Sequence, residues 1–124
     1  MVSKMFGVLF LFAAAAPNHW LDTRFNAKPL PAEWVPPGTP KSTLTDGIAL
    51  SHDCCPLDIR SFVARFGSPD RYLVGKKRVN GYSDLLVYDL QKLTVILYVA
   101  DPPETRLGAV AIDEKSGKNV RLIK

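Results

Sequence analysis

The fold is decided by residues 56–69, which read Pro-Leu-Asp-Ile-Arg-Ser-Phe-Val-Ala-Arg-Phe-Gly-Ser-Pro. Ile59, Phe62, Val63 and Phe66 occupy positions i, i+3, i+4 and i+7, so they form one apolar stripe on a 3.6-residue period. The leading proline suits a first helical position, and the closing Gly-Ser-Pro stops a helix. This stretch therefore predicts a short amphipathic helix whose apolar side needs a partner.

The chain after this helix alternates apolar and polar residues with period 2, which predicts strands. The expected strands are residues 71–78, 83–88, 92–100, 107–112 and 119–123. Short turns separate them, as at Asn80-Gly81, and short turns favour an antiparallel meander because parallel pairing needs long crossovers. The predicted fold class is α+β, with one amphipathic helix packed on a four- to five-stranded antiparallel meander sheet.

The N-terminal third divides into two parts. Residues 1–16 carry Lys4 and then an apolar run of roughly 12 residues, which is typical of an export signal and falls short of the ~20 residues that span a bilayer. A buried N-terminal helix or strand is the alternative. Residues 17–46 are rich in proline and predict an irregular arm. Residues 47–124 then form a single α+β domain, whose residues 47–51 favour a short edge strand. We expect a periplasmic or secreted protein with no transmembrane span after signal cleavage.

Composition narrows the class of partner. The chain has 124 residues, 47% of them hydrophobic and 23% charged, which fits one ordinary globular domain. The net charge of +4 is modest, and no dense basic patch or nucleic-acid-binding module is present. No nucleic acid partner is expected, although the basic run at residues 76–78 leaves weak binding of an anionic polymer open.

The expected sheet has a second face that the helix does not cover. We expect Tyr88, Ile96 and Tyr98 to lie on this face, and an exposed apolar patch usually marks an interaction surface. Trp20 and Trp34 of the irregular arm either cover it or dock into a groove of another protein. The predicted function is therefore non-catalytic binding of another protein, whose identity the sequence does not give.

Cys54 and Cys55 are adjacent and are the only cysteines of the chain. They suit a vicinal disulfide with a redox role, which makes a thiol-dependent redox protein the alternative function. A thiolate nucleophile assisted by His52, a metal site, or simple burial as small apolar side chains are further possibilities. No phosphate loop, zinc-protease motif or nucleophile elbow is present, so we predict no enzyme, no metal and no cofactor.

The helix stop Phe66-Gly67-Ser68-Pro69, followed by a meander with a tyrosine-containing segment at residues 82–88, resembles small periplasmic proteins of the BamE/SmpA-like and beta-lactamase-inhibitor-like families. The likeness covers residues 57–99. It implies a non-catalytic envelope protein that binds other proteins through its sheet or loops. The chain lacks the acylated cysteine that the lipoprotein members carry after the signal, so the likeness does not imply outer-membrane anchoring.

Overall fold

The computed structural model describes residues 19–79, 82–100 and 107–124. Residues 19–79 hold α2, β1, α3, α4 and β2, residues 82–100 hold β3 and β4, and residues 107–124 hold β5 and β6. In chain order the elements are α2 (His19–Arg24), β1 (Phe25–Lys28), α3 (Asp46–Ala49), α4 (Ile59–Phe66), β2 (Arg71–Val79), β3 (Tyr82–Asp89), β4 (Leu93–Ala100), β5 (Leu107–Glu114) and β6 (Asn119–Ile123).

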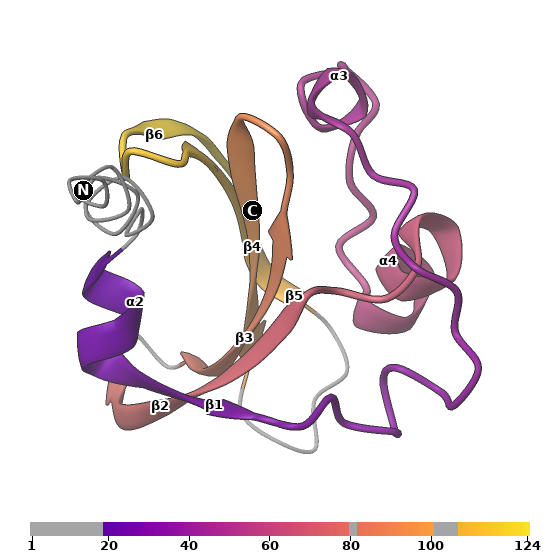
Figure 1. Cartoon of the computed structure of the whole chain (residues 1–124). Helices are drawn as coiled ribbons and strands as arrows, with labels where there is room; N and C mark the ends of the chain where they lie inside the picture. Colours follow the sequence, from indigo (N-terminus) through magenta and orange to yellow (C-terminus); the bar gives the residue numbers. More distant parts are fainter. Residues whose placement is uncertain (1–18, 80–81, 101–106) are drawn as a thin grey trace, which may run out of the picture.

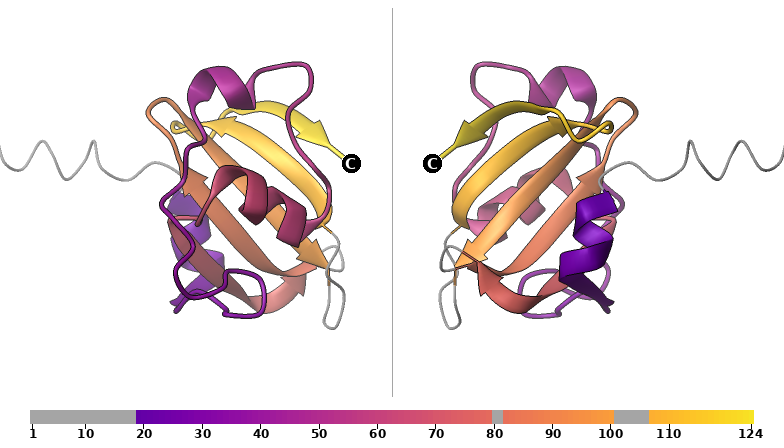
Figure 2. Two further views of the ribbon diagram at one scale, coloured as in Figure 1. Left: turned by 90° about the vertical axis from the view of Figure 1, so that its right-hand side faces the viewer. Right: turned by 90° about the vertical axis from the view of Figure 1, so that its left-hand side faces the viewer.

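The strands form one antiparallel sheet in the order β1-β2-β3-β4-β5-β6, so every strand pairs with its neighbours along the chain. The sheet is strongly curved (Figure 1). Helix α2 lies on its concave side, whereas α4 lies on its convex side, as the two views of Figure 2 show. Both faces of the sheet are therefore covered over part of their area.

The predicted fold class is wrong in the number of strands and helices, although the antiparallel sheet is confirmed. In the described residues the sheet has six strands rather than four or five, and two further short helices, α2 and α3, accompany the expected helix, α4. The extra strand, β1, comes from the segment assigned to an irregular arm, because Phe25–Lys28 is a proline-free run just before Pro29. It pairs with β2 from Phe25 opposite Gly75 to Lys28 opposite Tyr72.

Helix α4 begins and ends through local backbone chemistry. The Asp58 carboxylate accepts a 3.0 Å hydrogen bond from the Ser61 amide and so caps the first turn. Gly67 ends the helix with a φ of 90°, and its amide donates to the Val63 carbonyl. The buried stripe of the helix consists of Ile59, Phe62, Val63 and Phe66.

Two clusters of buried side chains lie on opposite faces of the sheet. The convex cluster contains the α4 stripe and the residues Leu86, Tyr88, Leu93, Val95, Leu97, Val99, Val110 and Ile112 of the sheet. The concave cluster consists of Leu21, Phe25, Leu73, Leu85, Val87, Ile96 and Ala111. Because successive residues of a strand point to opposite faces, alternate residues of β3, β4 and β5 feed the two clusters.

Residues 47–51, expected to be an edge strand, instead lie in and just after α3. The Thr45 side chain accepts a hydrogen bond from the Ile48 amide and caps this helix. The Asp46 carboxylate then accepts from the amides of Lys92 and Leu93 at 3.1–3.2 Å. These contacts fix α3 to the turn between β3 and β4, and only the folded chain brings that turn within reach.

Candidate functional site

The expectation that Tyr88, Ile96 and Tyr98 share one uncovered face is wrong. Tyr88 and Ile96 are completely buried and belong to different clusters, Tyr88 to the convex one and Ile96 to the concave one. The register explains the error, because Tyr88 is the cross-strand partner of Val95 and cross-strand partners point to the same face. Tyr88 and Ile96 are core residues and do not line a surface.

Tyr98 is half-buried and packs against the edge of the concave cluster. Trp34 is 3% exposed and meets the Tyr72 ring edge-on, with 6.3 Å between ring centroids. The arm therefore packs against the domain through this indole. Trp20 belongs to α2, but its side chain lies outside what the structure describes.

Cys54 and Cys55 are joined in a vicinal disulfide between α3 and α4. Cys55 is buried and Cys54 is half-buried, so the pair lies at the edge of the convex cluster. Cys55 has a φ of 106° and is the one non-glycine residue with positive φ in the described part of the chain. That conformation costs on the order of 1–3 kcal/mol and persists only where the surroundings hold it. His52 lies exposed just before the pair.

Arg121 connects β6 to the segment that holds the disulfide. Its Nη2 atom donates hydrogen bonds to the carbonyls of Ala49 at 2.6 Å and Ser51 at 3.1 Å. The Ser51 carbonyl also accepts from the Cys54 amide. A charged donor on backbone carbonyls makes a strong contact, so the end of α3 is held against the last strand.

Among the described residues, the exposed large apolar side chains are Leu30, two near α3 and two on β6. Val120 and Leu122 of β6 are 40% and 48% exposed, and Ile48 and Leu50, in and directly after α3, are also exposed. Within the described chain β6 pairs only with β5, so no described strand pairs with the backbone groups of its outer edge. We call this edge, with Val120 and Leu122, the β6 edge.

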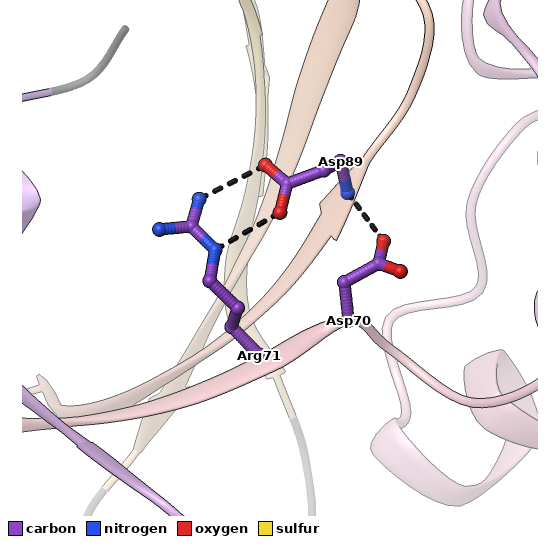
Figure 3. A network of polar contacts seen from close by, with 3 residues as sticks. All are labelled: Asp70, Arg71 and Asp89. Atoms are coloured by element: carbon purple, nitrogen blue, oxygen red, sulfur yellow. Dashed lines mark hydrogen bonds and ion pairs between the residues drawn. The ribbon is translucent and has the colours of Figure 1, made fainter. Parts of the chain in front are cut away.

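A network of polar contacts joins the start of β2 to the end of β3 (Figure 3). Nε and Nη2 of Arg71 each donate a 2.9 Å hydrogen bond to the Asp89 carboxylate. The Asp89 amide donates in turn to the Asp70 carboxylate at 2.7 Å. Because the Arg71 and Asp89 side chains are each 33% exposed, water screens this ion pair, and its role is to fix the strand register.

Two carboxylate side chains of the sheet, Asp84 and Asp113, are buried. Burial raises the pKa of Asp113 above its usual value, and its Oδ1 atom accepts no hydrogen bond from the described residues. Asp84 accepts a 2.5 Å hydrogen bond from the Tyr72 hydroxyl. Burial, followed by this bond, raises the pKa of Tyr72. Asp84 therefore has its partner, whereas Asp113 is an incompletely satisfied carboxyl group.

The described residues contain no group of three or more His, Cys, Asp or Glu side chains placed to hold a metal ion. Among the helices of the described chain, none is both long and apolar enough to cross a bilayer. Comparison with family models, with curated proteins and with solved structures finds no match to this chain. The resemblance to BamE/SmpA-like proteins therefore stays a prediction.

Sequence patterns did not point to the β6 edge as a candidate binding surface. The exposure of Val120 and Leu122 follows from the position of β6 at the end of the sheet, which the strand pattern alone does not reveal. One signal was available, since Val120 and Leu122 alternate with polar residues in the last predicted strand. Without the strand order, that alternation predicts that Val120 and Leu122 lie on a buried face of the strand.

Proposed function

We propose that this chain is an exported, non-catalytic protein-binding module of the cell envelope, and that its partner adds an extended segment to the β6 edge. The observation that carries the proposal is the combination of a strand edge that no described strand pairs with and two exposed apolar side chains, Val120 and Leu122. An exposed edge is a template for pairing with another chain, and strand addition is a recurrent mode of peptide recognition.

The chemistry of the edge suggests what the partner offers. Backbone hydrogen bonds to β6 provide affinity, and side chains at alternate positions provide specificity. Val120 and Leu122 are two residues apart and point to one face, so a partner segment with apolar residues at alternate positions suits them. The exposed Lys118 and Lys124 flank the strand and favour acidic residues beyond that apolar pair.

The fold holds the β6 edge in place before binding. The two hydrogen bonds from Arg121 fix the strand to the end of α3. A partner that pairs with a strand already ordered loses less conformational entropy on binding than one that must order it.

Two observations support export. Residues 1–16 have the composition of an export signal. The disulfide between Cys54 and Cys55 is typical of oxidising compartments, since cytosolic thiols are generally kept reduced.

Photo-crosslinking tests the proposal. A photoreactive amino acid at Leu122 should capture a discrete partner in the native host, whereas the same group at Asn26 of β1, on the opposite edge, should not. The double variant Val120→Glu, Leu122→Glu should prevent capture of that partner by a crosslinker at Lys124 while leaving the melting temperature within a few degrees. Equal capture at both edges, or no capture at either, would contradict strand addition at β6.

A thiol-dependent redox function is the second candidate, and the vicinal disulfide with the positive φ of Cys55 favours it. A dithiol reductant would break the Cys54–Cys55 bond, each sulfur would gain one electron and one proton, and the reductant would leave as its own disulfide. Opening the ring would free Cys55 to leave its costly conformation.

Thiol counting separates the two functions. If the pair works in redox exchange, a dithiol reductant should convert it reversibly to two alkylatable thiols in the folded protein. A Cys54→Ser, Cys55→Ser variant should lose the thiol–disulfide exchange but keep the crosslink at Leu122. A pair that becomes reducible only after unfolding would mark the disulfide as structural.

A further inference from the structure

A pocket lies between α4 and residues 33–43 of the arm, and none of its lining residues belongs to a strand. Its volume is about 350 Å³, within the range of small-molecule sites. None of its lining residues belongs to α3, β5 or β6, so it is separate from the proposed protein-binding edge. We infer that this pocket binds a small apolar molecule that carries one carboxylate.

The walls are mostly apolar and suit a flat or short aliphatic body. The Trp34 ring and the Pro36 and Pro40 rings come from the arm, and Val63 and Ala64 come from α4. Apart from Trp34 Nε1, which has no hydrogen-bond partner among the described residues, these side chains carry no hydrogen-bonding group. The body of the ligand therefore gains affinity mainly by leaving water.

The charges at the rim favour an anion. Lys41, Arg60 and Arg65 line the pocket, against one acidic residue, Glu33. None of the three cations forms an ion pair with a carboxylate of the described residues. The pocket therefore carries an excess of positive charge that no described side chain neutralises.

The two arginines are held in place without using all their donors. Nε of Arg60 donates a 3.4 Å hydrogen bond to the Glu33 carbonyl, which leaves its two terminal nitrogens for a ligand. The Arg65 guanidinium lies 5.2 Å from the centroid of the Phe66 ring, within range of a cation–π contact. Arginine is well suited to carboxylates because its planar fork can donate two parallel hydrogen bonds.

The wall opposite α4 is fixed by the backbone. The Thr43 amide donates to the Phe66 carbonyl at 2.8 Å, and the Ser68 amide donates to the Pro40 carbonyl at 2.9 Å. These bonds bring the arm so close to the end of α4 that a Cβ on Gly67 would lie 2.7 Å from the Lys41 carbonyl oxygen. A ligand that enters a preformed pocket binds without the loss of conformational entropy that ordering the pocket would cost.

A monocarboxylate fits better than a highly charged ligand. Three cations less one acid leave two positive charges, and the remaining lining is apolar except for Thr39 and Thr43. A polyphosphate would bury several charges against proline and tryptophan rings, which costs free energy that two arginines do not recover.

The test uses the full chain, ¹⁵N-labelled, titrated with 2-naphthoate and followed by NMR. Saturable shifts should appear at the Trp34 indole and at the α4 amides, and the uncharged analogue 2-naphthalenemethanol should bind at least fivefold more weakly. Arg60→Gln and Arg65→Gln should each weaken naphthoate at least threefold, whereas Lys28→Gln, which removes a charge from β1, should not.

A variant whose larger side chain fills the pocket tests the binding site independently of charge. Ala64→Phe should abolish the shifts, and Ala64→Ser should preserve them, with the spectrum of each variant showing an intact fold. The inference would be overturned by shifts that do not saturate, by shifts that map outside the pocket, or by equal binding of the charged and uncharged probes.

Discussion

The Tyr88 hydroxyl donates a 2.7 Å hydrogen bond to the Gly67 carbonyl and joins β3 to the residue that ends α4. Both groups are buried, and burial raises the pKa of Tyr88. The ring of the same tyrosine packs 5.3 Å from the Phe62 ring, between centroids. One side chain therefore supplies apolar contact and a polar link between helix and sheet.

Tyr88→Phe should remove the link but keep the ring. The Gly67 carbonyl would then lose its hydrogen bond in a buried site, which costs about 1–3 kcal/mol. Urea unfolding should show a lower midpoint with an unchanged slope. A midpoint equal to that of the parent protein would mean that water replaces the hydroxyl.

Three glycines allow backbone strain and steric conflict to be separated. Gly67 has a φ of 90°, and a Cβ there would meet the backbone of Lys41 and Ser42 within 3.0 Å, so Gly67→Ala should be the most destabilising. Gly38 has a φ of 88° with open space around it, so Gly38→Ala should cost about 1 kcal/mol from strain alone. Gly47 lies in α3 without either problem, and Gly47→Ala should stabilise by about 0.5–1 kcal/mol. Thermal unfolding that gave any other order would contradict this account.

Asp113 should make the stability of the protein depend on pH. Burial raises its pKa in the folded state, so the folded chain holds this proton more tightly than the unfolded chain. Its contribution to stability is present below the ordinary pKa of aspartate, about 3.9, and is lost as the pH rises through the folded-state pKa.

Asp113→Asn removes this titration. The variant should therefore unfold at a higher temperature than the parent at pH 7, and the difference should shrink towards pH 4. Glu114→Gln, at the exposed neighbouring position, is the matched control and should leave the profile unchanged. A parent profile that rises from pH 4 to pH 7 in step with the Asn variant would rule out this role for Asp113.

Arg121→Met should loosen α3 while leaving the sheet intact. Loss of the two bonds to Ala49 and Ser51 should speed amide hydrogen exchange in residues 46–54 severalfold, with exchange in β3 and β4 unchanged. Lys118→Met, at an exposed position near the start of β6, serves as the control. Uniformly faster exchange across the whole chain would instead indicate global destabilisation.

The sequence predicted the elements that local patterning specifies. Residues 59, 62, 63 and 66 are buried on one side of α4, as their 3.6-residue spacing predicts. Alternation located five of the six strands, and the short turns between them predicted antiparallel pairing. These features depend on residues that are near neighbours in the chain.

The elements that were missed depend on contacts made across the chain. The proline-rich composition of residues 17–46 concealed β1, which is a strand only because β2 offers it an edge. Residues 47–51 alternate like a strand, but Asp46 binds the amides of Lys92 and Leu93 and keeps α3 in place. Local preference is a weak guide where a distant partner supplies the hydrogen bonds.

The sequence by itself determined that this chain forms a short amphipathic helix and a set of antiparallel strands, because hydrophobic periodicity fixes which side of each element leaves water. Only the tertiary structure decided which surfaces remain available. Cross-strand register placed Tyr88 and Ile96 in opposite cores, and strand order put Val120 and Leu122 on the last strand of the described sheet. Exposure is a property of what packs against a residue, and that neighbour is usually far away in sequence.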